Sequence, residues 1–187
     1  FRSLTLGLSG QPISGADIGG FLFNADADLF GNWIGFGAFY PFARGHACAG
    51  TNNKEPWAFG KEIEDASRIA LERRYILLPY FYTLMHEAST NGMPIMRPVF
   101  FSDPKDLSLR AEEEAFLIGD DLLIIPAFAS QPALPKGIWK ELSLVNGDTN
   151  DKYQAKMKIR GGSIIPTGKI IQNTTESSLD PLTLLVC

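Results

Sequence analysis

The spacing of apolar side chains over residues 61–91 is the strongest structural signal in the sequence. Apolar residues recur there mostly three or four positions apart, which is the period of one face of an α-helix. Pro79 has no N–H to donate inside a helix, so the pattern predicts two helices or a kink near it. Asn91-Gly92 is a typical helix stop. The apolar positions are Ile63, Ala66, Ile69, Ala70, Leu77, Leu78, Phe81, Leu84, Met85 and Ala88.

The apolar stretches on either side of this helical region are shorter. Residues 4–8 are typical of a helix end. Residues 13–20 are small and apolar apart from Asp17, which predicts a short buried strand, and residues 94–101 predict another. Polar residues predict loops at 24–31 and 44–60.

The pattern changes in the second half, where strands dominate. One short charged helix is predicted at residues 110–117. The change predicts a domain boundary at residue 98, between an α/β part over residues 1–98 and an all-β part over residues 99–187. The predicted strands are residues 122–126, 138–144, 153–159, 163–166 and 182–186.

Composition narrows the possible functions. The 187 residues are 45% hydrophobic, enough for a core, and carry a formal net charge of -4. Without a basic surface the chain is a poor candidate for nucleic-acid binding. No membrane span is expected, because no apolar run approaches the roughly 20 residues that a spanning helix needs.

Cysteine and acidic residues give no sign of a metal or cofactor. Cys48 and Cys187 form neither a disulfide framework nor zinc-ligand spacing. The acidic loop at 24–28 lacks the glycine and the terminal glutamate of a calcium loop. We therefore predict no metal site and no cofactor. The compartment stays unknown, with the cytoplasm favoured over the secretory pathway.

The two ends of the sequence are unusual for a complete protein. The chain starts inside an apolar segment without an initiator Met, and residues 182–187 end inside a predicted strand. We expect the chain to be a piece of a longer one, with a partner in the missing N-terminal part of the same structure.

Asp17 is the first candidate for chemistry. A carboxylate within a small, apolar strand is costly to bury unless it is hydrogen-bonded or faces a polar ligand. The glycines beside it in Ser14-Gly-Ala-Asp-Ile-Gly-Gly-Phe21 allow a ligand to approach the backbone closely. The alternative is an aspartate at a strand end that caps the next turn.

An aromatic run then leads to Arg44 and His46. Aromatic faces suit stacking on a sugar, and Arg and His side chains can hydrogen-bond its hydroxyls. The alternative is a structural histidine whose hydrogen bonds are satisfied within the fold. Arg73, Arg74 and Arg97 are expected to be ion-pair partners rather than ligands.

Seven motifs occur in order along the sequence. They are Ser14-Gly-Ala-Asp-Ile-Gly-Gly-Phe21, Gly37-Ala-Phe-Tyr-Pro-Phe-x-Arg-x-His46, Glu55-Pro-Trp57, Arg74-Tyr-x-Leu-Leu-Pro-Tyr80, Tyr82-Thr-Leu84, Met96-Arg-Pro98 and Arg160-Gly-Gly-Ser-Ile-Ile-Pro166. Each motif alone is moderately specific, and their shared order makes the resemblance that follows strong. Together they resemble glycoside hydrolase family 31, the α-glucosidase family, over nearly the whole chain.

The resemblance implies a fold and a sugar site. Residues 1–98 would be strands seven and eight of a (β/α)8 TIM barrel with their helices, and residues 99–187 the start of a β-sandwich. Asp17 and His46 match family residues that hydrogen-bond the sugar that is cleaved. Phe21 matches an aromatic near the pocket mouth, and Arg44 would support the loop and Asp17.

The resemblance also implies that the catalytic residues lie elsewhere. Family members are retaining enzymes with two catalytic carboxyl groups. The nucleophile is expected in a Trp-x-Asp-Met-type motif and the acid in a Gly-Asp-Asn-type motif, and neither occurs here. Gly119-Asp120-Asp121 precedes a sandwich strand and is assigned no chemistry.

The implied function is therefore a fragment of a retaining α-glucosidase acting on the non-reducing ends of an oligosaccharide or glucan. Within the family, the motifs look closest to plant heteroglycan-type glucosidases and the catalytic subunit of glucosidase II. An α-xylosidase or another α-glycosidase on the same scaffold is a second reading, and a non-catalytic sugar-binding module is a third. The isolated chain is predicted to be inactive and to lack independent stability.

Overall fold

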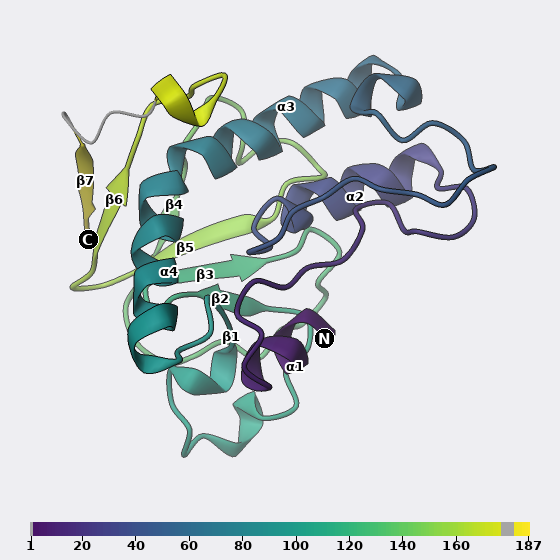
Figure 1. Cartoon of the computed structure of the whole chain (residues 1–187). Coiled ribbons are helices and arrows are strands. Elements are labelled where there is room, and N and C mark those ends of the chain that lie inside the picture. Colours follow the sequence, from purple (N-terminus) through teal and green to yellow (C-terminus); the bar gives the residue numbers. More distant parts are fainter. Residues whose placement is uncertain (1, 177–181) are drawn as a thin grey trace.

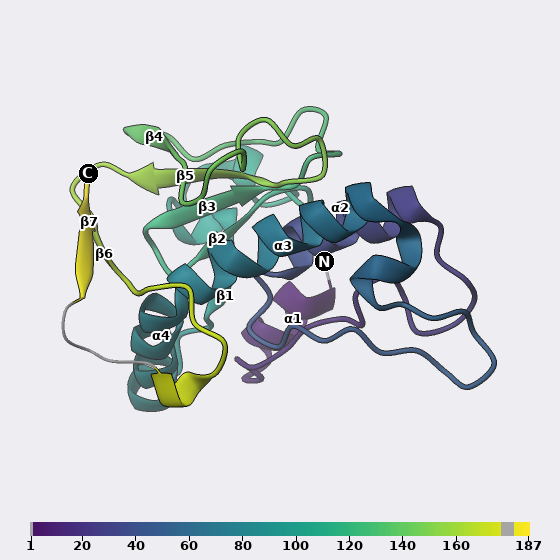
Figure 2. The ribbon, with the colours of Figure 1, turned by 90° about the horizontal axis from the view of Figure 1, so that it is seen from above.

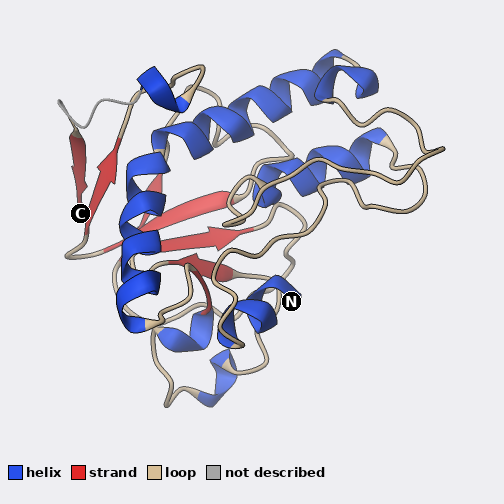
Figure 3. Cartoon of the chain, viewed as in Figure 1, coloured by secondary structure: helices blue, strands red, loops and turns tan. Residues whose placement is uncertain are grey.

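The computed structural model describes residues 2–176 and 182–187, with the α-helices in the first half of the chain and the strands in the second (Figures 1 and 3). The α-helices are α1 (Arg2–Leu8), α2 (Ala27–Gly37), α3 (Lys61–Ile76) and α4 (Leu78–Asn91). Short 3₁₀ turns are η1 (Pro56–Phe59), η2 (Val99–Phe101), η3 (Leu107–Leu109) and η4 (Thr174–Glu176). The strands are β1 (Met96–Pro98), β2 (Phe116–Ile118), β3 (Leu122–Ile125), β4 (Trp139–Leu142), β5 (Lys156–Arg160), β6 (Ile164–Thr167) and β7 (Thr183–Val186).

The helices pack on one side of an antiparallel sheet. Its strand order is β1-β2-β3-β5-β4, while β6 and β7 form a separate pair. Seen from above, α1 to α4 lie on the same side of the five-stranded sheet (Figure 2). Leu77 and Phe81 share one core cluster with Ile118 and Ile124, so α4 and the sheet bury each other's apolar faces.

The predicted break in the long helical region is confirmed. Leu77 separates α3 from α4 with φ -85° and ψ 0°, and Pro79 lies in the first turn of α4, where no N–H partner is needed. Gly92 ends α4 in the left-handed conformation with φ 77°, as the Asn91-Gly92 signal predicts. Leu77 is fully buried, so the bend is fixed by packing as well as by the proline.

Helix α2 was not expected from the polar residues around it. The loop predicted over 24–31 is wrong beyond Asp26, whose side chain accepts a 2.8 Å hydrogen bond from Leu29 N and caps the helix. Gly31 and Gly35 read as helix breakers in sequence. In the fold they face Tyr153, and a Cβ on Gly35 would lie 1.8 Å from the Tyr153 carbonyl oxygen.

The strand predicted over residues 13–20 is also wrong. Only a single parallel bridge forms there, between Asp17 and Arg44, with Ile18 N donating to Arg44 O at 2.8 Å. Gly15 permits the close approach, since a Cβ on it would lie 1.8 Å from the Phe42 carbonyl oxygen. Strand pairing needs a continuous neighbour, and the segment around Arg44 supplies one for a few residues only.

The helix predicted over 110–117 does not form, and residues 116–118 are β2 instead. Leu117 packs in a cluster with Leu123 on one face of the sheet, while Ile118 packs on the other face. Because both faces are buried, the strand is continuously apolar and shows no alternation. The carboxylate of Glu112 accepts from Ala115 N at 2.9 Å and fixes the turn before the strand.

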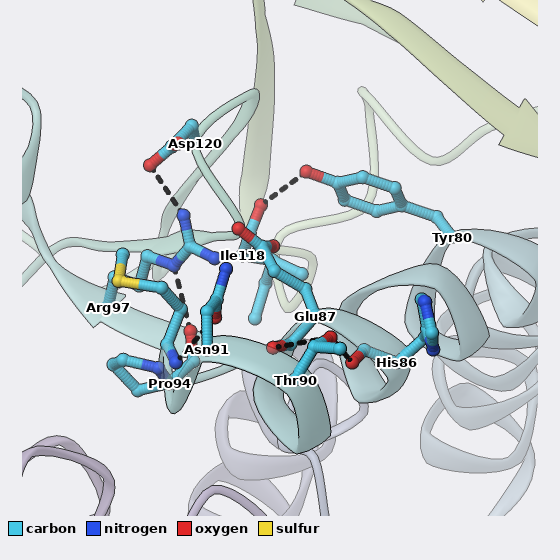
Figure 4. A network of polar contacts seen from close by, with 10 residues as sticks. Tyr80, His86, Glu87, Thr90, Asn91, Pro94, Arg97, Ile118 and Asp120 are labelled. Carbon is cyan, nitrogen blue, oxygen red and sulfur yellow. Dashed lines mark hydrogen bonds and ion pairs between the residues drawn. The ribbon is translucent and has the colours of Figure 1, made fainter.

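Strand β1 joins the two halves of the chain. The strand predicted over 94–101 shortens to three residues before η2, and β1 pairs with β2 of the second half. The domain boundary at residue 98 stays a prediction. Arg97 is 1% exposed and forms the predicted ion pair, with Asp120 at 2.6 Å and Glu87 of α4 at 2.8 Å (Figure 4).

Candidate functional site

Asp17 and Arg44 form the centre of the candidate site. Nε and Nη2 of Arg44 both lie 2.8 Å from the same carboxylate oxygen, Oδ1 of Asp17. Oδ2 makes no hydrogen bond within the described part of the chain. The side chain of Asp17 is 17% exposed and that of Arg44 is 49% exposed, so the pair lies at the surface with one acceptor oxygen free.

Phe21 and His46 form a second contact beside this ion pair. Their ring centroids are 5.5 Å apart and the rings are tilted by 36°. Both side chains are exposed. Cys48 N donates to Phe21 O at 2.9 Å, which ties the two segments together just beyond the rings. All four residues predicted to contact substrate therefore lie on two adjacent segments.

A cavity of about 570 Å³ borders one side of this arrangement. Arg44 and His46 line it together with Ile18, Phe30 and the loop over residues 47–56. Asp17 and Phe21 do not line this cavity. The structure thus brings the predicted residues together, but only Arg44 and His46 face this hollow.

Arg74 holds the aromatic run that leads to Arg44. It was expected in an ion pair, and instead its guanidinium donates to the backbone oxygens of Ala38 and Tyr40 at 2.6 Å and of Pro41 at 3.2 Å. Burial lowers its pKa. A cation that binds three carbonyls needs no carboxylate partner, because carbonyl oxygens carry the negative end of the peptide dipole.

Arg73 behaves differently from its neighbour. Its side chain is 1% exposed, as is that of Asp148 at 3.7 Å, so the expected ion pair is present. Arg73 also donates to Gln154 Oε1 at 3.0 Å and Ala155 O at 2.6 Å. Burial lowers its pKa to about 10. This cluster ties α3 to the segment before β5 and has no place in the candidate site.

Three contacts that fix the site carry no sequence signature. Lys54 Nζ donates to Gly20 O at 2.5 Å, and Asn52 N donates to the side-chain oxygen of Asn24 at 2.7 Å. With the bond from Cys48 N, they join residues 20–24 to residues 48–54. Most of these partners are backbone atoms, which every residue type provides.

Among the described residues, no group of three His, Cys, Asp or Glu side chains could hold a metal ion.

Two family models match the chain one after the other. The TIM-barrel domain of glycosyl hydrolases family 31 matches residues 2–84, and the family 31 C-terminal domain matches residues 92–165. This chain belongs to glycoside hydrolase family 31. The predicted fold class, part of a TIM barrel followed by a β domain, is confirmed.

Family 31 relatives are similar over almost the whole chain. An uncharacterized family 31 glucosidase of Schizosaccharomyces pombe is 38% identical over 98% of the chain and 20% of its own length. A probable glucan 1,3-alpha-glucosidase of Arabidopsis thaliana is 38% identical over 98% of the chain and 22% of its own length. The chain thus spans about a fifth of the length of these curated relatives.

A solved structure shows the same family 31 fold. The family 31 alpha-glucosidase from Bacteroides thetaiotaomicron is 88% identical, with a TM-score of 0.89, over 99% of this chain and 30% of that one.

None of the helices in the described part of this chain has the length and apolar character to cross a membrane.

Proposed function

We propose that this chain is part of a longer retaining α-glucosidase that hydrolyses α-glucosidic bonds at non-reducing ends, and that Asp17, Phe21, Arg44 and His46 bind the sugar that is cleaved. The observation that carries the proposal is the geometry of Asp17. Two N–H groups of Arg44 donate to Oδ1 of Asp17, which leaves Oδ2 free to accept from a sugar hydroxyl.

The roles of the four residues follow from their contacts. Arg44 keeps the Asp17 carboxylate in one orientation, and a charge-assisted bond from a sugar hydroxyl to Oδ2 is stronger than a neutral one. The exposed ring of His46 can hydrogen-bond a second hydroxyl. Phe21, tilted against His46, offers an apolar wall for the C–H groups of the sugar ring.

The chemistry itself needs carboxyl groups outside this chain. In the retaining reaction one carboxylate attacks the anomeric carbon while a carboxylic acid protonates the leaving oxygen, and water then releases the sugar from the enzyme. The sugar ring flattens towards an oxocarbenium ion along this path. Contacts of Asp17 and His46 that strengthen as the ring flattens would raise turnover, because they favour the transition state over the substrate.

The experiment has two parts. The reading frame upstream of Phe1 should continue into a Trp-x-Asp-Met-type motif, and a start codon at this point would favour a sugar-binding module instead. The full-length protein should then hydrolyse p-nitrophenyl α-glucoside and release the α-anomer first, as followed by NMR. Preference for p-nitrophenyl α-xyloside would transfer the proposal to an α-xylosidase.

A further inference from the structure

Residues 21–23 form an exposed apolar segment directly after the candidate site. Leu22 is 60% exposed and Phe23 is 82% exposed. Phe23 has φ 65°, and it is the one non-glycine residue with positive φ in the part of the chain that the structure describes. A bulky residue in this conformation is unusual in proteins.

Within the described part of the chain, the contacts of the Phe23 ring do not offset the cost of its positive φ. A non-glycine residue in the left-handed region costs on the order of 1 kcal/mol, which a glycine would avoid. An exposed ring also recovers little of the free energy of apolar burial. A contact outside the described chain would bury the ring and offset this cost.

The backbone around Phe23 is held in place. Gly20 O and Phe21 O on one side, and the side chain of Asn24 on the other, are bonded to residues 48–54. The segments that precede α2 and α3 run side by side at the same end of the molecule (Figures 1 and 2). The ring is thus presented by a braced turn, two residues after Phe21 and its contact with His46.

We propose that Phe23, with Leu22, is the platform for the leaving sugar, the unit on the far side of the bond that is cleaved. This inference rests on the proposed function and adds a specificity residue to the same site. The exposed ring suits the apolar C–H face of a pyranose, and its place beyond Phe21 suits the unit after the one held by Asp17 and His46. The other possible occupant is another segment of the same polypeptide packed over the ring.

Substrates with and without a leaving sugar separate these occupants. Maltose has a leaving sugar, whereas α-glucosyl fluoride has none, so we compare kcat/KM for the two substrates in the full-length enzyme. Phe23→Gly should lower the ratio of the maltose value to the fluoride value roughly tenfold, the size expected for one lost aromatic contact. Phe23→Asn, which also tolerates positive φ, should lower the ratio similarly, while Phe23→Tyr keeps the ring and should keep the ratio. Tyr82→Ala is the matched control, since Tyr82 is also an exposed aromatic (74%) but lies on α4.

The melting temperature supplies the second readout. Phe23→Gly removes strain, so the melting temperature should stay level or rise. An unchanged substrate ratio would overturn the proposal, and so would a clear fall in the melting temperature, which would show that another segment buries the ring. If the wild-type protein hydrolyses neither substrate, the proposed function fails, and that outcome is distinct from a failure of the platform.

Discussion

Arg44 fixes Asp17 in two ways, through its side chain on the Asp17 carboxylate and through its backbone oxygen, which accepts from the next residue, Ile18. Two guanidinium N–H groups converge on one oxygen of Asp17, and the same two residues form the parallel bridge between their segments. The cation–aromatic contact of Arg44 with Phe42, at 5.4 Å, restrains the guanidinium further. A carboxylate fixed in this way is ready to accept a sugar hydroxyl without first being reordered.

Arg44→Met in the full-length protein should therefore impair catalysis through Asp17. Loss of the restraint is expected to lower kcat/KM for p-nitrophenyl α-glucoside by about 100-fold, the scale of a small misplacement of a positioning group. The melting temperature should hardly change, because exposed ion pairs contribute little to stability. Arg44→Lys can supply one N–H in place of two and should recover part of the loss. No recovery, together with a lower melting temperature, would indicate a structural role only.

Asp17→Ala and His46→Ala test direct sugar contact. Each substitution should lower kcat/KM by at least about 100-fold while the fold survives, because each removes a hydrogen-bonding group from the sugar site. Circular dichroism and the melting temperature check the fold. Near-wild-type kinetics in both variants would defeat the assignment of these residues.

Gly35→Ala should destabilise the protein through the contact between α2 and Tyr153. The new Cβ would lie 1.8 Å from a backbone oxygen, which cannot move aside as a flexible side chain can. We expect a loss of about 3 kcal/mol, the upper range for overpacking, measured by denaturant unfolding. Gly45→Ala is the control, since nothing lies within 4 Å of a Cβ there. Equal stability of the two variants would show that α2 can shift away from Tyr153.

The helices that the sequence predicts correctly are those that local chemistry determines. Residues within a few positions of each other determine three features: the apolar spacing of α3 and α4, the break between them near Pro79, and the end of α4 at Gly92. Helix α2 is not determined in this way, because its glycines are helix breakers locally and are required by distant residues, as Gly35 is by the Tyr153 backbone more than 100 residues later. The acidic run before β2 likewise predicts a helix locally, whereas pairing with β1 and β3 makes residues 116–118 a strand.

The candidate site shows the same division. Asp17, Arg44 and His46 stand out in sequence as polar groups among glycines and aromatics, and the structure places them on two neighbouring segments. The bonds from Lys54, Cys48 and Asn52 that brace these segments could not be predicted, because they end mainly on backbone atoms. The exposed ring of Phe23 could not be predicted either, since nothing in the residue pattern indicates a positive φ.

Asp121 should make stability depend on pH in the opposite sense to most carboxylates. Burial raises its pKa above the ordinary 3.8, and repulsion from Asp120 and, more weakly, from Glu87 raises it further. Attraction to Arg160 and Arg97 lowers the pKa but does not cancel this rise. The ionised group therefore costs stability at neutral pH, and the cost disappears as pH falls through the raised pKa. Asp121→Asn should raise the melting temperature at pH 7, with no gain left below pH 3.8.

Asp106, the residue before η3, supplies the control of opposite sign for Asp121. Hydrogen bonds from Ser108, and then Lys136, lower the pKa of Asp106. That group contributes stability at neutral pH, which is lost as pH falls through its lowered pKa. Asp106→Asn should thus lower the melting temperature at pH 7 and have no effect in strong acid. Melting curves of both variants between pH 3 and pH 7 that run parallel to wild type would contradict these assignments.

Removing Arg97 should destabilise the protein less than removing both of its carboxylate partners (Figure 4). Arg97 is 1% exposed, whereas Glu87 and Asp120 are 34% and 54% exposed. After Arg97→Met both carboxylates can turn to water, and the main loss is the 2.8 Å bond to Pro94 O, about 1–2 kcal/mol. Glu87→Ala with Asp120→Ala leaves a buried cation unpaired and should cost about 3 kcal/mol or more. Glu113→Ala, which removes an exposed acid on the segment before β2, should be neutral in the same denaturant titrations. A smaller loss in the double variant than in Arg97→Met would show that water reaches the guanidinium once its partners are gone.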